Sequence, residues 1–257
     1  MLVHEDEGVS QPLRLQAFLR ATAAPGRELV YVPPFTVYLD RRDPLRYLNY
    51  AIPDGDVEPD AAAIDRLRDV FRARDRLPRL EWLEESAPRL ASALAARGMA
   101  EELRSPLMVC SEDELIEARA TADGLTIAPV GEADVRDCVN LQRVAFGQPA
   151  LADGEVPGDR GAGGGGAVLA RVSAQAVAAA AWTPIVGGVT EIVGVATTES
   201  WRGRGLAGAV TAGAARDAFS AGASLCVLSP GSETAQRVYI RAGFRPVATM
   251  LHWSDPA

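Results

Sequence analysis

The chain has no lysine and only two histidines, so a histidine-based catalytic triad or zinc site has few possible members. All 26 basic residues are arginine, which we attribute, with the abundant alanine, to base-composition bias. Cys110, Cys138 and Cys226 lie in apolar stretches and show no C-x-x-C spacing. We therefore expect buried, reduced thiols and no metal site.

Long hydrophobic runs are also missing. The longest, residues 176–182, is far shorter than the ~18 to 20 apolar residues that cross a bilayer, so no membrane span is expected. The first residues, M-L-V-H-E-D-E-G, are acidic where a secretory signal is basic and then apolar. These features predict a cytoplasmic protein.

Basic residues are fewer than acidic ones, and the formal net charge is −8. Residues 1–123 carry 16 arginines against 23 acids, whereas residues 124–257 carry 10 against 11. An acidic balance repels nucleic-acid phosphates and anionic lipid. We expect cationic or neutral partners, and we expect neither nucleic acid nor a membrane as a partner. The sequence is compatible with an oligomer.

Hydrophobic residues make up 48 % of the 257, which is typical of a globular protein. Periodicity and turn residues predict two halves, 1–123 and 124–257. In the first half we expect strands at 35–40, 47–54, 78–83 and 103–110, and helices from about 59 and over 87–98. In the second we expect a strand near 126, a helix over 132–146, strands at 167–172, 176–182, 190–198, 224–228 and 244–253, and helices over 204–222 and 233–242.

Each half ends in the order helix, strand, helix, strand, which suggests a duplicated unit. The predicted helix over 132–146 presents Val135, Val139, Leu141 and Val144 as its apolar side. Residues 153–166 are so rich in glycine that we expect a mobile loop there.

The stretch W-R-G-R-G-L-A-G, residues 201–208, fits two cofactor motifs. As G-x-G-x-x-G it is a dinucleotide-binding turn, but that turn needs its first glycine at the strand's end and an acid about 20 residues on. Here four residues intervene, and the next strand ends in Ser229 without an acid. As R-x-x-G-x-A it is a loop that wraps the pyrophosphate of an acyl-CoA, and we prefer that interpretation.

This loop, followed by a helix, a strand and T-A-Q-R-V-Y-I-R-A-G-F, resembles the GNAT superfamily of acyl-CoA-dependent N-acyltransferases over about residues 126–253. The resemblance implies an α/β fold with a mixed, mostly antiparallel sheet flanked by helices. The first half lacks the loop yet shows a similar element order. The chain therefore resembles tandem GNAT proteins, with 1–123 a degenerate copy without a cofactor loop and 124–257 the acetyltransferase domain.

The resemblance implies acetyl-CoA as cosubstrate and no metal. Glycines before a helix leave backbone N–H groups uncovered, so a pyrophosphate is bound largely by main chain, and a bulky residue at Gly205 is expected to abolish binding and leave the fold intact. Ser232 stands where many relatives carry asparagine, so that contact is altered. The implied cofactor residues are Val195, Ala196, Thr197, Arg202, Gly203, Arg204, Gly205, Leu206, Ala207, Ser232 and Ala235.

Two residues are candidates for proton transfer. The resemblance implies that Tyr239, four residues before Gly243, protonates the departing thiolate; the alternative is a tyrosine that packs under the cofactor. Glu191, eleven residues before Arg202, matches the register of a family base, and alternation places it on one face with Val193, Val195 and Thr197. Its alternative is a solvated acid at a strand's start.

These observations predict an acyl-CoA-dependent N-acetyltransferase acting on an amine of a small molecule or a protein terminus. A CoA-binding sensor or regulatory module without turnover is the alternative. The presence of both Glu191 and Tyr239 favours the enzyme.

Overall fold

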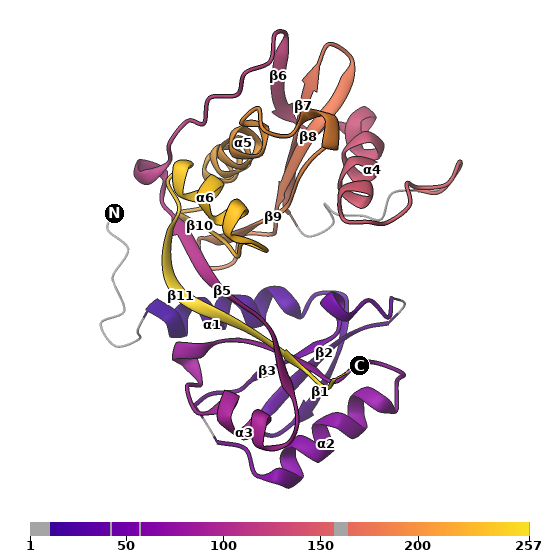
Figure 1. Cartoon of the computed structure of the whole chain (residues 1–257), viewed down its shortest axis with the longest axis vertical. Coiled ribbons are helices and arrows are strands. Elements are labelled where there is room, and N and C mark those ends of the chain that lie inside the picture. The colour runs from indigo at the N-terminus through magenta and orange to yellow at the C-terminus, as the bar shows by residue number, and fades with distance from the viewer. Residues whose placement is uncertain (1–10, 42, 57, 157–163, 257) are drawn as a thin grey trace. The chain divides into compact units, whose positions relative to one another are not determined.

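The computed structural model describes residues 11–41, 43–56, 58–156 and 164–256 (Figure 1). The chain divides into two compact units. Unit 1 comprises Met1–Leu107 and Val247–Ala257, and unit 2 comprises Met108–Pro246. The centre of the glycine-rich segment, 157–163, lies outside the described residues, so the loop expected there stays a prediction.

Unit 1 is a five-stranded layer in the order β1-β2-β3-β4-β11, antiparallel except for the pair β3 and β4. Its helix α2 begins after Asp60, whose side chain accepts a hydrogen bond from the Ala63 amide at 2.7 Å. Ile64, Leu67 and Phe71 then face the core with Trp82 of β4. The elements are α1 (Gln11–Ala23), β1 (Arg27–Val32), β2 (Phe35–Asp40), β3 (Tyr50–Pro53), α2 (Ala61–Arg72), β4 (Arg79–Leu83), α3 (Leu90–Ala96) and β11 (Arg245–Ser254).

Unit 2 has the strand order β5-β10-β9-β8-β7-β6, and of the pairs β10–β5, β10–β9, β9–β8, β8–β7 and β7–β6 only β10–β9 is parallel. Helices α5 and α4 cover opposite faces of the β7–β8–β9 strands (Figure 1). The expected mixed, mostly antiparallel sheet is confirmed. The elements are the last three residues of β5 (Ala100–Cys110), whose residues 100–107 belong to unit 1, and β6 (Leu125–Pro129), α4 (Val135–Ala145), β7 (Gly166–Val172), β8 (Gln175–Trp182), β9 (Val189–Thr197), α5 (Leu206–Ser220), β10 (Leu225–Leu228) and α6 (Glu233–Arg241).

The two units do not coincide with the expected halves, 1–123 and 124–257. Strand β5, the last strand of the first half, ends beside β10 of unit 2, with Cys110 opposite Cys226. Strand β11, the last strand of the second half, pairs with β4 of unit 1. Residues 108–123 of the first half therefore belong to unit 2, and residues 247–257 of the second half belong to unit 1.

Most expected elements are present within a few residues of their predicted bounds, but α1 and β1 were not predicted. The buried side of α4 also differs in part from the apolar side that the sequence predicted. Val144, expected in the core, is 62 % exposed, whereas Cys138, Leu141 and the polar Gln142 are buried. All three cysteines are free and buried, as expected, and burial raises the pKa of the Cys226 thiol to about 12.

Candidate active site

Strand β9 contains a bulge at its centre. Ile192 and Val193 pair with β8 in one register, and Ala196 and Thr197 pair in another, with one extra residue in β9 between them. Gly194 lies in the extra stretch with φ of +62°, a conformation that favours glycine. The bulge thus shifts the side-chain alternation of β9 halfway along the strand.

The bulge corrects the predicted face of β9. Ile192 and Val195 both pack into the cluster under α5, whereas Ala196 packs into the cluster under α4. Residues 192 and 195 could not share a face in a regular strand. The expectation that Glu191 and Val193 share a face with Val195 and Thr197 is therefore wrong.

A buried side chain holds the bulge in place. Gln142 of α4 is 2 % exposed, and its Nε2 donates a hydrogen bond to the Gly194 carbonyl at 2.8 Å. A Cβ at Gly194 would lie 2.4 Å from the same nitrogen, so a side chain there would displace Gln142 in addition to straining the backbone. Gln142 was not anticipated because a glutamine on an apolar helix face gives no sequence signal of its own.

Helix α5 begins with no side-chain cap. Its N-cap residue is Gly205, with φ of +79°, and no side chain accepts a hydrogen bond from the first turn. The first amides of a helix lack intrahelical partners and carry the positive end of the helix dipole. An uncapped N-terminus of this kind binds anions such as phosphate.

A cavity of about 800 Å³ lies at this helix end. Ten of the eleven predicted cofactor residues line it, namely Val195, Ala196, Thr197, Arg202, Gly203, Gly205, Leu206, Ala207, Ser232 and Ala235. Ten further residues that the sequence did not single out complete the lining, namely Glu117, Ala118, Arg119, Ala145, Phe146, Trp201, Gly208, Thr234, Val238 and Arg241. Two motifs 30 residues apart in sequence thus contribute to one cavity.

The eleventh residue, Arg204, is not in the lining. Its guanidinium lies over the Trp201 ring, 4.5 Å from the centroid, and its carbonyl accepts a hydrogen bond from the Thr121 amide at 3.0 Å. Ser232 is the N-cap of α6, and its hydroxyl accepts a hydrogen bond from the Ala235 amide at 3.2 Å. Ser232 therefore fixes the helix start at the cavity wall.

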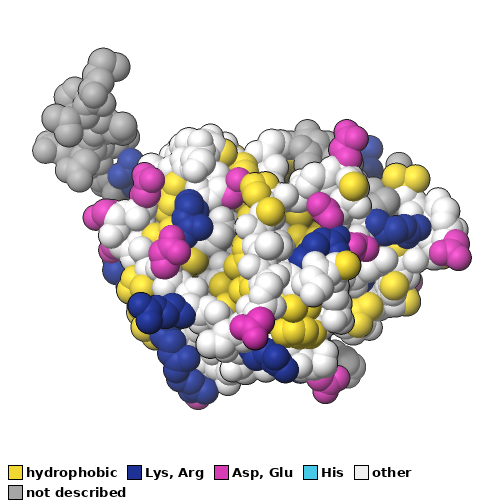
Figure 2. Space-filling model, turned by 90° about the horizontal axis from the view of Figure 1, so that it is seen from above, with side chains coloured by type: hydrophobic (Ala, Val, Ile, Leu, Met, Phe, Trp, Pro, Cys, Tyr) yellow, Lys and Arg dark blue, Asp and Glu magenta, His cyan; other side chains and the backbone are white. Residues whose placement is uncertain are grey.

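The polar groups of the lining suit an anionic ligand. Arg119, Arg202 and Arg241 have no ion-pair partner among the described residues, and the one lining carboxylate, Glu117, is paired with Arg216. The face drawn in Figure 2 mixes side chains of both signs. The three arginines of the lining are therefore the source of attraction for an anion that we assign to this cavity.

A buried hydroxyl in the lining also lacks a partner. Thr197 Oγ1 is inaccessible to solvent and makes no hydrogen bond to the described part of the protein. An unpaired buried hydroxyl costs free energy unless a ligand or water satisfies it. The uncapped start of α5 and the three arginines fit an anionic, phosphorylated ligand.

The two predicted catalytic residues are not among the lining residues. Tyr239 packs against the core under α5, with its ring 6.4 Å from that of Phe244, and burial raises the pKa of its phenol. Its neighbour Val238 reaches the lining instead. Glu191 is half-buried on β9, and its amide donates a hydrogen bond to Thr183 Oγ1 at 3.0 Å.

Comparisons with known proteins define the class. Residues 137–244 match the acetyltransferase (GNAT) family. A GCN5-related N-acetyltransferase from Kribbella flavida is 33 % identical, covers 97 % of both chains and superposes with a TM-score of 0.82. This protein therefore belongs to the GNAT family and is an acetyltransferase.

Two further solved structures share the fold at lower identity. A tandem GNAT protein from the clavulanic acid biosynthesis pathway is 13 % identical with a TM-score of 0.61, over 92 % of this chain and 86 % of that one. A putative GNAT acetyltransferase from Novosphingobium aromaticivorans is 18 % identical with a TM-score of 0.58, over 96 % of this chain and all of the other. No curated protein matches the chain.

No group of three or more His, Cys, Asp or Glu side chains within the described residues could hold a metal ion. No helix in the described ranges is both long enough and apolar enough to cross a membrane.

Proposed function

We propose that the protein transfers acetyl from acetyl-CoA, bound in the cavity at the N-terminus of α5, to an amine of a small molecule or a protein terminus. The observation that carries the proposal is the convergence of the phosphate loop, the end of β9 and the start of α6 on one cavity. Family membership favours this enzyme over a CoA sensor without turnover.

In this proposal different residues of the cavity bind different parts of acetyl-CoA. The free amides of Leu206 and Ala207, with Arg202, hold the diphosphate. Val195 to Thr197 follow the bulge, line the cavity and offer backbone groups to the pantetheine arm. The amine nitrogen forms a bond to the thioester carbonyl carbon, the C–S bond breaks, and the thiolate gains a proton as the nitrogen loses one.

Tyr239 and Glu191 are our candidates for these proton transfers. The raised pKa of Tyr239 keeps the phenol protonated at neutral pH, as a donor to the thiolate requires. Because neither residue lines the cavity, each role depends on the arrangement with substrate bound. Should neither act, proximity of amine and thioester must supply most of the acceleration.

The experiment is a titration of CoA followed by a screen of amines for thiol release. CoA binding with saturable, amine-dependent release of free thiol supports the proposal, and no binding of CoA contradicts it. With an active amine in hand, Tyr239→Phe should lower kcat by roughly 10- to 10⁴-fold with little change in CoA affinity.

Glu191→Gln should remove the acidic limb of the kcat/KM profile, and a second amine of different pKa separates this limb from substrate ionisation. Wild-type rates in both variants between pH 6 and 9 would disprove the two assignments.

A further inference from the structure

The segment that joins β5 to β6 passes over the start of α5. Residues 112–114 form a short 3-10 helix, and residues 115–121, which we call the strap, form no regular element. Glu117, Ala118 and Arg119 of the strap line the cavity of the proposed cofactor site. The strap precedes the half that carries the motifs, and no motif marks it.

The strap is anchored at its start. Glu114 accepts hydrogen bonds from the Ser111 amide at 3.0 Å and from Arg245 Nε at 2.7 Å. The Ile116 amide then donates to the Ala242 carbonyl at 3.1 Å. These contacts involve the backbone at the end of α6, so the strap enters the site in a fixed direction.

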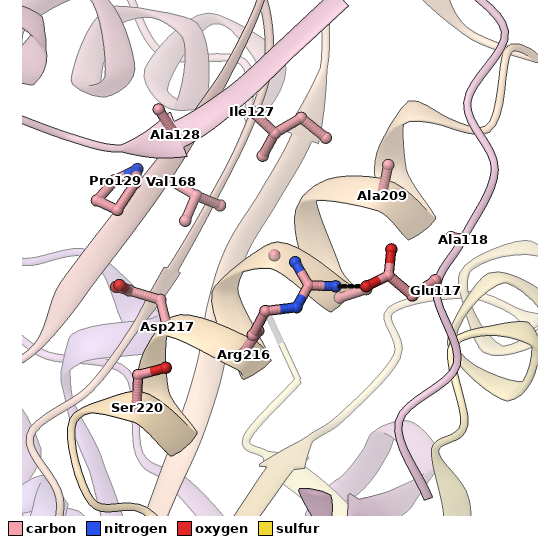
Figure 3. A pocket seen from close by; sticks show the side chains of 12 residues that line it. Glu117, Ala118, Ile127, Ala128, Pro129, Val168, Ala209, Arg216, Asp217 and Ser220 are labelled. Carbon is pink, nitrogen blue, oxygen red and sulfur yellow. Dashed lines mark hydrogen bonds and ion pairs between the residues drawn. The ribbon is translucent and has the colours of Figure 1, made fainter.

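The middle of the strap packs along α5. Glu117 forms an ion pair with Arg216, which projects from α5 toward it (Figure 3). Glu117 and Ala118 also line a second cavity of about 250 Å³, so the strap borders both cavities. A Cβ at Gly208 would lie 3.1 Å from the Ala118 Cβ, which shows how closely the strap packs on the helix.

Its end is fixed at the phosphate loop. A Cβ at Gly205 would lie 2.5 Å from the Arg119 carbonyl oxygen, and the Thr121 amide donates to the Arg204 carbonyl at 3.0 Å. The backbone of Arg119 therefore rests against the N-cap of α5. Arg119 is one of the residues that line the cavity; it is exposed, and its guanidinium has no hydrogen-bond or ion-pair partner in the described ranges.

We propose that Arg119 binds the diphosphate of acetyl-CoA, so that the strap is part of the cofactor site. The backbone of Arg119 is already held in place, and a guanidinium forms short, charge-assisted hydrogen bonds with phosphate oxygens. Arg202 supplies a second cation to the same lining. This inference rests on the proposed function, since it assumes CoA in that cavity.

The test compares CoA with 3′-dephospho-CoA, which shares the diphosphate. Arg119→Ala should weaken both ligands by the same factor, roughly 10- to 100-fold, in a calorimetric titration at low salt. Arg119→Lys, which keeps the charge but not the fork of donors, should recover part of the loss. Arg66→Ala is the matched control, since Arg66 is exposed on α2 and unpaired among the described residues.

Three results would overturn the inference. Arg119→Ala affinities within twofold of wild type would show that Arg119 makes no contact. A loss for CoA but not for 3′-dephospho-CoA would place Arg119 on the 3′-phosphate. An equal loss in Arg66→Ala would reduce the effect to net charge. Absence of binding by the wild-type protein would instead contradict the proposed function itself.

Discussion

At the scale of single residues, Gly205 meets two separate constraints. Its φ of +79° lies in the left-handed region, where a side chain is strained. The space that a Cβ would fill is also taken by the Arg119 carbonyl. The expectation that a bulky residue here leaves the fold intact is therefore not supported, because the strap would have to move.

Gly203 provides a matched comparison for Gly205. Its φ is +78°, but a Cβ there would meet nothing within 4 Å. Alanine at either position should cost about 1 to 2 kcal/mol of backbone strain. Gly205→Ala should cost about 1 to 3 kcal/mol more, because the added methyl overpacks against the strap. Thermal unfolding of the two variants measures this difference, and equal melting temperatures would show that the strap yields without cost.

Site residues with a local signal were predictable from the sequence, and those without one were not. The loop residues Arg202 to Ala207 follow a spacing that backbone physics dictates, and all but Arg204 reach the cavity. The face of Glu191 was mispredicted because alternation assumes a regular strand, and a bulge at a lone glycine is hard to foresee. Arg119 and Gln142 carry no local pattern, since only tertiary packing brings them to the site.

At the scale of elements, the bounds of strands and helices were easier to predict than their faces. Gly98 and Gly243 follow helices that end where the sequence indicated, because glycine readily adopts the conformation that ends a helix. The apolar side of α4 was predicted in part: Val139 and Leu141 are buried, whereas the buried Gln142 was missed because it is polar. The strap was not predicted at all, since an irregular segment has no period.

The anchor of the strap should make stability depend on pH. Hydrogen bonds from Arg245 and Ser111 lower the pKa of Glu114 to about 2, below its ordinary 4.5. A depressed carboxyl pKa stabilises the fold fully above the unfolded value, and that stabilisation is lost as pH falls toward 2. Wild type should therefore exceed Glu114→Gln in the free energy of unfolding at pH 7, and the gap should shrink between pH 4.5 and 2.

Urea titrations at several pH values measure that gap. Glu112→Gln is the control, because the Glu112 carboxylate has no hydrogen-bond or ion-pair partner within the described ranges. Its gap to wild type should stay small and flat over the same range. A Glu114→Gln gap that does not change with pH would contradict the assignment of the anchor to the ionised carboxylate.

At the scale of the whole molecule, the two halves of the chain repeat one order of elements. Helix, strand, helix, strand describes both α2-β4-α3-β5 and α5-β10-α6-β11. That repetition was visible in the sequence because it rests on periodicity and turn residues. The bounds of the two units were not, because they depend on contacts between residues far apart in the chain.

The corresponding helix starts predict that the chain binds one CoA and not two. Helix α5 starts at Gly205 without a side-chain cap, whereas the Ala63 amide of α2 already donates to the carboxylate of Asp60. A carboxylate at a helix N-terminus occupies the amides and repels a diphosphate. Calorimetry or native mass spectrometry should therefore give a saturating ratio of one. A ratio of two would contradict this prediction and would show that unit 1 has a CoA site without the phosphate loop. A variant with Arg202→Ala should then still bind one CoA.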